Sequence, residues 1–196
     1  MTRSSFAPPV VEHRAATAVL PPLEIHRSPR RRRTGHAAAR SGRIIVRVPA
    51  GMSAASEQEL VSRLVAKVVR SRSIEALGGD EGLAARADTL ADTYLDGVRA
   101  SEVRWSRRMA HRYGSCTPGD GTIRISDRLA EHPSYVLDYI LVHELAHLRV
   151  AHHTAAFREL VARFPEAERA RGFLEGHEAG QLAAARLVDP TVEETA

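Results

Sequence analysis

The chain of 196 residues contains one cysteine, Cys116, and few aromatic residues. A single cysteine excludes an intramolecular disulfide and any zinc site built from several thiolates, so histidine and carboxylate side chains remain as the strong metal ligands. Phenylalanine, tyrosine and tryptophan together make up 5% of the sequence. Its apolar content comes mainly from alanine, valine and leucine, which favours helices with modest side chains.

Long apolar runs are also missing. The N-terminal stretch MTRSSFAPPVVEHR never builds the apolar segment that a signal peptide needs, and no stretch approaches the length of a membrane span. We therefore expect a cytoplasmic protein without a membrane partner. The length is sufficient for one domain with a sizeable core and a tail.

The net charge of +4 is distributed unevenly along the chain. Residues 1–42 carry a net charge of +6, whereas the remainder carries −2. The same segment holds five prolines and shows no sustained periodicity, so residues 1–42 are predicted to be a disordered Arg/Pro-rich tail, and residues 191–196 a disordered C-terminus. The run Arg30–Arg33 predicts a weak contact with nucleic acid or an acidic surface; the alternative is a solvated extension.

Residues 43–190 are predicted to form one α+β domain. Apolar periodicity and turn residues predict strands at 44–48, 103–109 and 121–126 and helices at 56–76, 81–99, 134–151, 154–164 and 166–188. The strands at 103–109 and 121–126 are expected to pair, with a turn at 118–121 leading into the second.

The helix expected from Ser134 carries the sequence His143-Glu144-Leu145-Ala146-His147, and His153 follows. Residues four apart on a helix point in nearly the same direction, so the imidazoles of His143 and His147 can share one metal ion. The alternative is an ordinary helix that happens to carry these residue types, and a third candidate ligand at His153 makes that alternative less attractive.

Three neutral imidazoles with one open position are typical of a catalytic zinc ion. Glu144 would then remove a proton from zinc-bound water as it attacks a carbonyl, and pass the proton to the departing amine. The predicted chemistry is zinc-dependent hydrolysis of a peptide or protein substrate.

The third ligand has alternatives in the sequence. His152 adjoins His153, and Glu166 and Glu168 lie farther on. The spacing of His153 from His147 favours His153. The same spacing occurs in metzincins, but Val150 stands at the position of their turn glycine, and no methionine follows the site.

Three segments together resemble one known family. They are Arg112–Cys116, Tyr139–Leu148 and His152–Phe157, in matching order and spacing. The chain resembles the YgjP-like zinc metallopeptidases, which are related to SprT/Spartan-type and WLM-type proteases, from about residue 43 to 164. Tyr113 replaces the family's tryptophan and His152 its asparagine, both outside the proposed ligands.

The resemblance implies a zincin-like (minigluzincin) fold. In that fold a small twisted antiparallel sheet packs on the active-site helix, helices flank it, and the edge strand can pair with an extended substrate. The segment Arg112–Cys116 would lie beside the metal cleft. Arg112, Tyr113 and His111 are then candidates for stabilising an oxyanion, turn geometry would explain Gly114, and Cys116 would be a small buried residue rather than a nucleophile or ligand.

Three functions therefore compete. The first is a zinc metallopeptidase with His143, His147 and His153 as ligands and Glu144 as the base. The second is a nucleic-acid-associated protein whose zinc is structural and needs a fourth protein ligand. The third is a protease of the DNA–protein crosslink type, recruited to nucleic acid by residues 1–42. The substrate and the oligomeric state are not indicated by the sequence.

Overall fold

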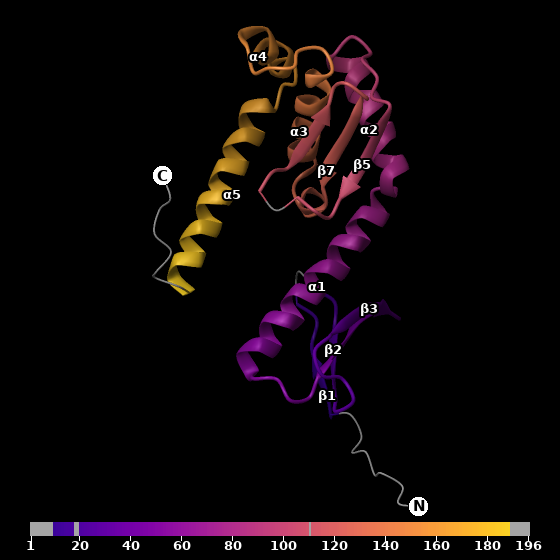
Figure 1. Ribbon diagram of the computed structural model, residues 1–196, viewed down its shortest axis with the longest axis vertical. Coiled ribbons are helices and arrows are strands. Elements are labelled where there is room, and N and C mark those ends of the chain that lie inside the picture. The colour runs from indigo at the N-terminus through magenta and orange to yellow at the C-terminus, as the bar shows by residue number, and fades with distance from the viewer. Residues whose placement is uncertain (1–9, 18–19, 110, 189–196) are drawn as a thin grey trace, which may run out of the picture. The chain divides into compact units, whose positions relative to one another are not determined.

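A computed structural model of the chain describes residues 10–17, 20–109 and 111–188. The chain divides into two compact units, Met1–Ser73 and Ile74–Ala196 (Figure 1). The sequence predicted a boundary after residue 42, between a tail and a domain, whereas the two units meet after Ser73. We describe each unit by itself.

The first unit is a four-stranded sheet with one helix. Its strands are β1 (Val10–Arg14), β2 (Leu23–Ser28), β3 (His36–Arg40) and β4 (Arg43–Pro49), in the order β1-β2-β4-β3. β2 and β4 run parallel, and the other neighbouring strands are antiparallel. Because side chains alternate along a strand, Ile25, Val46 and Val48 share one face, where they pack with Leu60 and Val61 of helix α1 (Ala54–Ala76).

The prediction that residues 1–42 are disordered is wrong for the described part of that segment. β1, β2 and β3 all lie within it. β2 has only two apolar residues, and it is stabilised because Ile25 is buried against Val46 of β4, a partner 21 positions away in sequence. A short stretch of sequence around β2 shows the prolines and arginines, but it does not contain the strand with which β2 pairs. Residues 1–9 and 191–196 lie outside the described residues.

The second unit contains a three-stranded sheet in the order β5-β7-β6. β5 (Glu102–Ser106) pairs with β7 (Thr122–Ser126) as expected, but in parallel, whereas β6 (Gly114–Thr117) pairs with β7 as an antiparallel hairpin. The sheet is therefore mixed, and the prediction of an antiparallel sheet is wrong for β5. β5 ends beside Ser126 and β6 begins beside Ile125, at the same end of the sheet. β7 then lies between these two strands and runs parallel to β5, which periodicity alone does not reveal. β6 is left as an edge strand.

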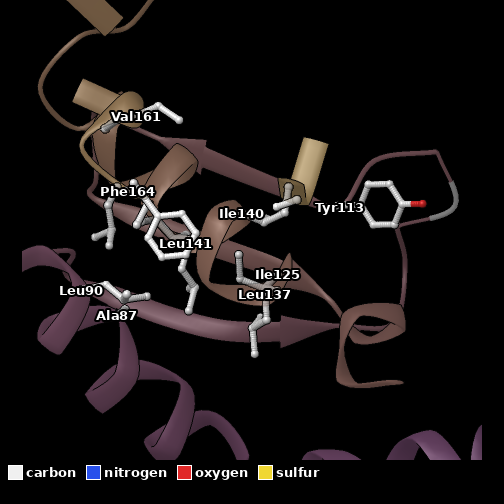
Figure 2. Packing of buried hydrophobic residues seen from close by; sticks show 14 of the residues in the cluster. Ala87, Leu90, Tyr113, Ile125, Leu137, Ile140, Leu141, Val161 and Phe164 are labelled. Atoms are coloured by element: carbon white, nitrogen blue, oxygen red, sulfur yellow. The ribbon is translucent and has the colours of Figure 1, made fainter. Parts of the chain in front are cut away.

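Helix α3 (Ser134–His147) is the central element of this unit. It packs against α2 (Gly79–Tyr94), the sheet, α4 (Ala155–Ala162) and α5 (Ala167–Val188). Figure 2 shows Leu137 and Leu141 of α3 among side chains from the neighbouring elements. Val142 and Ala146 are also buried, so the buried surface of α3 extends well beyond the side that carries Leu137 and Leu141. The short 3₁₀ helix η1 (Asp127–Glu131) precedes α3. Among the described residues, no helix has the length and apolar character needed to cross a membrane.

Replacing Leu141 with alanine tests the packing of the second unit. Leu141 is fully buried, so Leu141→Ala should lower the free energy of unfolding by about 2–5 kcal/mol through lost burial and a residual cavity. Trp105 is the only tryptophan of the chain and packs against this core, so its fluorescence during urea unfolding reports on this unit. Leu187, which is 88% exposed, supplies the control: Leu187→Ala should change stability by less than about 0.5 kcal/mol. Equal effects of the two changes would contradict this packing.

Candidate metal centre

Helix α3 brings two histidines to one side. His143 and His147 are one helical turn apart, and their ring centroids are 5.0 Å from each other. Both side chains are partly buried. The apolar residues of α3 face the core, which leaves these imidazoles directed toward a cavity of about 510 Å³.

His153 completes the group because the chain turns back after α3. The amide of Val150 donates to the carbonyl of Ala146, and the Thr154 hydroxyl accepts from the amide of Phe157 to begin α4. This turn places the Nε2 atom of His153 3.1 Å from Nε2 of His143 and 3.1 Å from Nε2 of His147.

The spacing of the three nitrogens suits a metal ion. Ligands about 2.0–2.1 Å from a tetrahedral zinc ion lie about 3.4 Å apart, close to the separation found here. Nδ1 of His147 lies 3.3 Å from the carbonyl oxygen of Val150, an arrangement that places the proton on Nδ1 and leaves the Nε2 lone pair for a metal.

Burial favours the neutral form of the two histidines on α3. Burial, followed by the neighbouring His147 and His153, lowers the pKa of His143 to about 4. Burial also lowers the pKa of His147, which outweighs the opposing contact with the Val150 carbonyl. Neutral imidazole is the form that binds metal, so the residues present fit a zinc ion at neutral pH.

The alternative third ligands lie outside this group. Among the described residues, His143, His147 and His153 are the histidine, cysteine or carboxylate side chains that come together here. Glu166 forms an ion pair with Arg169, and Glu168 forms one with Arg171. His152 is exposed and is not a member of the group.

Phe157 supports all three imidazoles, a role that the sequence did not reveal. Its ring centroid lies 4.9 Å from that of His143, 4.4 Å from that of His147 and 4.7 Å from that of His153. Phe157 is 2% exposed, so it forms an apolar floor that restricts the orientation of the rings. In the sequence, the only indication of this role is that Phe157 lies in the first turn of the helix that Thr154 caps, shortly after His153.

Glu144 lies beside the imidazoles in the cavity wall. It is 7% exposed, and burial raises the pKa of its carboxyl to about 7. The positive charge of Arg112 and a hydrogen bond from the Cys116 amide oppose that rise. A buried carboxyl group with a pKa near neutral is suited to exchanging protons.

Gly114 is required by the close approach of Glu144 to the edge strand. A methyl group at Gly114 would overlap Oε1 of Glu144 and would lie 2.8 Å from its Cγ atom. Gly114 belongs to β6 and is not among the glycines with positive φ. The prediction that turn geometry explains this glycine is therefore wrong: the missing side chain makes room for a carboxylate.

Arg112, Tyr113 and Cys116 all line the same cavity. The guanidinium of Arg128 covers the ring of Tyr113 at 4.7 Å, and burial, followed by the charge of Glu178, raises the pKa of the Tyr113 hydroxyl. Figure 2 shows that this hydroxyl points away from the aliphatic core. Burial, followed by the charge of Glu144, raises the pKa of the Cys116 thiol to about 11, so it stays protonated at neutral pH and is a poor nucleophile. His111 lines a different cavity, with residues of α5.

Two adjacent histidines provide a matched test of the third ligand. His153→Ala should lower zinc affinity by more than about 100-fold, since loss of a partner outside the ligand set alone costs 10–100-fold. His152→Ala should change it by less than about threefold, because His152 lies outside the group. Competition with a zinc-binding dye measures both constants. Unchanged affinity in His153→Ala would place the third ligand elsewhere.

Comparison with known proteins now supports the resemblance seen in the sequence. The model of the YgjP-like, metallopeptidase domain family matches residues 80–177, which is half of the chain. A crystal structure of the metallopeptidase zymogen abylysin from Pyrococcus abyssi is similar at 25% identity and a TM-score of 0.41, over 46% of this chain and 86% of that one. No curated protein matches the sequence. The matched segment contains helix α3 and the complete histidine group, and the chain therefore belongs to the YgjP-like metallopeptidase family.

Proposed function

We propose that this protein is a zinc-dependent peptidase in which Glu144 is the general base. The observation that carries the proposal is the buried carboxyl of Glu144 beside three converging imidazoles in one cavity. His143, His147 and His153 would hold the zinc ion through their Nε2 atoms. When bound, zinc supplies Lewis acidity and lowers the pKa of a water ligand to about 7.

Glu144 moves the protons in this proposal. Its carboxylate takes a proton from the attacking water, and the resulting carboxylic acid then donates it to the nitrogen of the departing amine. A pKa of about 7 supports both roles, because the group is then present in both forms near neutral pH. The hydrogen bond from the Cys116 amide holds the carboxyl in the cavity wall.

β6 is suited to bind an extended substrate. It is an edge strand whose backbone pairs with β7 on one side only, and Gly114, Ser115 and Cys116 line the cavity. A peptide added along this edge would be recognised through its main chain, which gives weak sequence selectivity. Arg112 lines the cavity as a positive charge and is our candidate for stabilising the oxyanion. Tyr113 is a weaker candidate because its ring is held beneath Arg128.

A purely structural zinc ion is less well supported. Structural sites are usually closed by four protein ligands, and the described residues bring three suitable side chains together. The cavity beside these three leaves room for a substrate. An open position next to a buried carboxyl group is the arrangement of a hydrolase.

Glu144→Gln provides the direct test. The amide keeps the shape of the side chain but cannot accept the proton, so the rate of cleavage should fall by about 10²–10⁴-fold while zinc affinity stays within threefold of the parent value. A proteome-derived peptide library analysed by mass spectrometry avoids the need to know the substrate. If the zinc-loaded parent cleaves nothing in the library, or if Glu144→Gln cleaves as fast as the parent, the proposal is wrong.

Two glycines of the same segment test the space above Glu144. Gly114→Ala should displace the carboxyl group and reduce cleavage by about 10²-fold, as expected for a small misplacement of a catalytic group. Gly119→Ala is the control, because a methyl group there meets no other atom within 4 Å and should leave the rate unchanged. Both variants should retain zinc, since neither residue touches a ligand histidine. Equal rates in the two variants would contradict the close approach.

A further inference from the structure

The division into two units is also a division of charge. Residues 1–73 contain 14 lysines and arginines against 4 acidic residues, a net charge of +10, whereas residues 74–196 carry −6. Such asymmetry within one chain points to a polyanionic partner for the basic part. The structure places many of these cations on a folded sheet rather than on a disordered tail.

The sheet of the first unit has one face that its own helix does not cover. Ile25, Val46 and Val48 face α1, so the alternate residues lie on the opposite face. There, His26 of β2 and His36 of β3 both pair in register with Arg47 of β4. This gives one row of basic side chains across three strands, which we call the His26–Arg47–His36 row.

A second row of basic side chains lies at the other end of the same face. Arg43 of β4 pairs in register with Arg40 of β3, and both side chains are exposed. Like charges directly opposite each other destabilise a sheet, so this arrangement has a cost that a bound anion would offset. Glu24 is the one acidic residue among the described strand residues of this face, and it is already engaged with His26 and Arg43.

The Arg30–Arg33 loop extends this cationic face. It follows Ser28 of β2 and precedes His36 of β3, so it lies at the same end of the sheet as the His26–Arg47–His36 row. Arg32 and Arg33 are exposed, and Arg31 donates to the carbonyl of Thr34, which orders the turn. Four strands about 4.8 Å apart give a face roughly 15 Å wide, enough for several phosphates.

The chemistry of this face selects phosphate groups over bases. The sequence contains no phenylalanine, tyrosine or tryptophan between residues 7 and 93, so the described part of the first unit lacks the aromatic platforms on which unpaired bases stack. Arginine in this setting contacts phosphate oxygens without reading sequence. Glu24, Ile45 and Ala38 lie in register between the two rows, and Arg40 and Arg43 are exposed.

We propose that the uncovered face of the sheet formed by β1, β2, β3 and β4, with the Arg30–Arg33 loop, binds nucleic acid through its phosphate backbone and without sequence preference. The surface involves none of the metal-centre residues, so the inference stands independently of the peptidase activity. In this proposal a folded surface, rather than a disordered tail, binds the nucleic acid.

Fluorescence anisotropy with the full-length protein and a labelled DNA duplex of about 20 base pairs tests the proposal. The logarithm of the association constant should fall linearly with the logarithm of salt concentration, with a slope of about −3 to −6 for this number of phosphate contacts. The triple variant Arg40→Gln, Arg43→Gln, Arg47→Gln should bind at least about tenfold more weakly at 0.1 M salt, and its slope should be smaller by about 2–3.

A triple variant on α1 distinguishes the contribution of this sheet face to binding from that of the overall net charge. Arg63→Gln, Lys67→Gln and Arg72→Gln remove the same charge from exposed positions outside the sheet face, and should weaken binding by less than about threefold. Equal weakening by both triple variants, or no binding by the parent at 50 mM salt, would overturn the proposal. Displacement of DNA by polyglutamate at equal charge concentration would also overturn it, and would identify an acidic-protein surface instead.

Thermal unfolding followed by circular dichroism checks that the variants are folded. If the sheet-face triple variant has lost its folded structure, the double variant Arg32→Gln, Arg33→Gln takes its place, because it alters only exposed loop positions. Its salt slope should be smaller than that of the parent by about 1–2. An unchanged slope in that variant would overturn the proposal.

Discussion

The burial of helix α3 on nearly all sides is the constraint on which the second unit depends. Its apolar residues fill the space between α2, the sheet, α4 and α5, and therefore fix the rotation of the helix. That rotation decides where His143, Glu144 and His147 point. One set of packing contacts thus stabilises the core and orients His143 and His147, so the precision of the candidate site follows from the density of the core.

Glu144 occupies a position that few side chains could share. Its carboxyl group is nearly excluded from water and lies under the edge strand, where Gly114 leaves space and the Cys116 amide donates a hydrogen bond. The same burial raises the pKa of the carboxyl group toward neutrality. The packing that places this carboxyl group therefore also sets its acid–base chemistry, because burial disfavours its charged form.

The first unit shows why composition alone was misleading. Arginines and prolines in residues 1–42 resemble those of a disordered segment, yet three strands form there. Ile25 of β2 and Ala37 of β3 pack on the apolar surface of β4 and α1, and β1 then pairs with β2. In the second unit the partner of β5 was predictable, but its direction was not. Both differences arise from contacts between segments distant in sequence, which a local pattern of residues does not contain.

The sequence by itself determined the family, the α+β class and the pair of histidines one turn apart, because a helical repeat relates neighbours in sequence to neighbours in space. The sequence favoured His153 as the third ligand but did not exclude His152, Glu166 or Glu168. His153 approaches the pair only because of the turn after α3. Phe157 beneath the imidazoles and Gly114 above Glu144 emerged only from the tertiary structure. Their roles depend on contacts across elements, and close packing, rather than local spacing, determines those contacts.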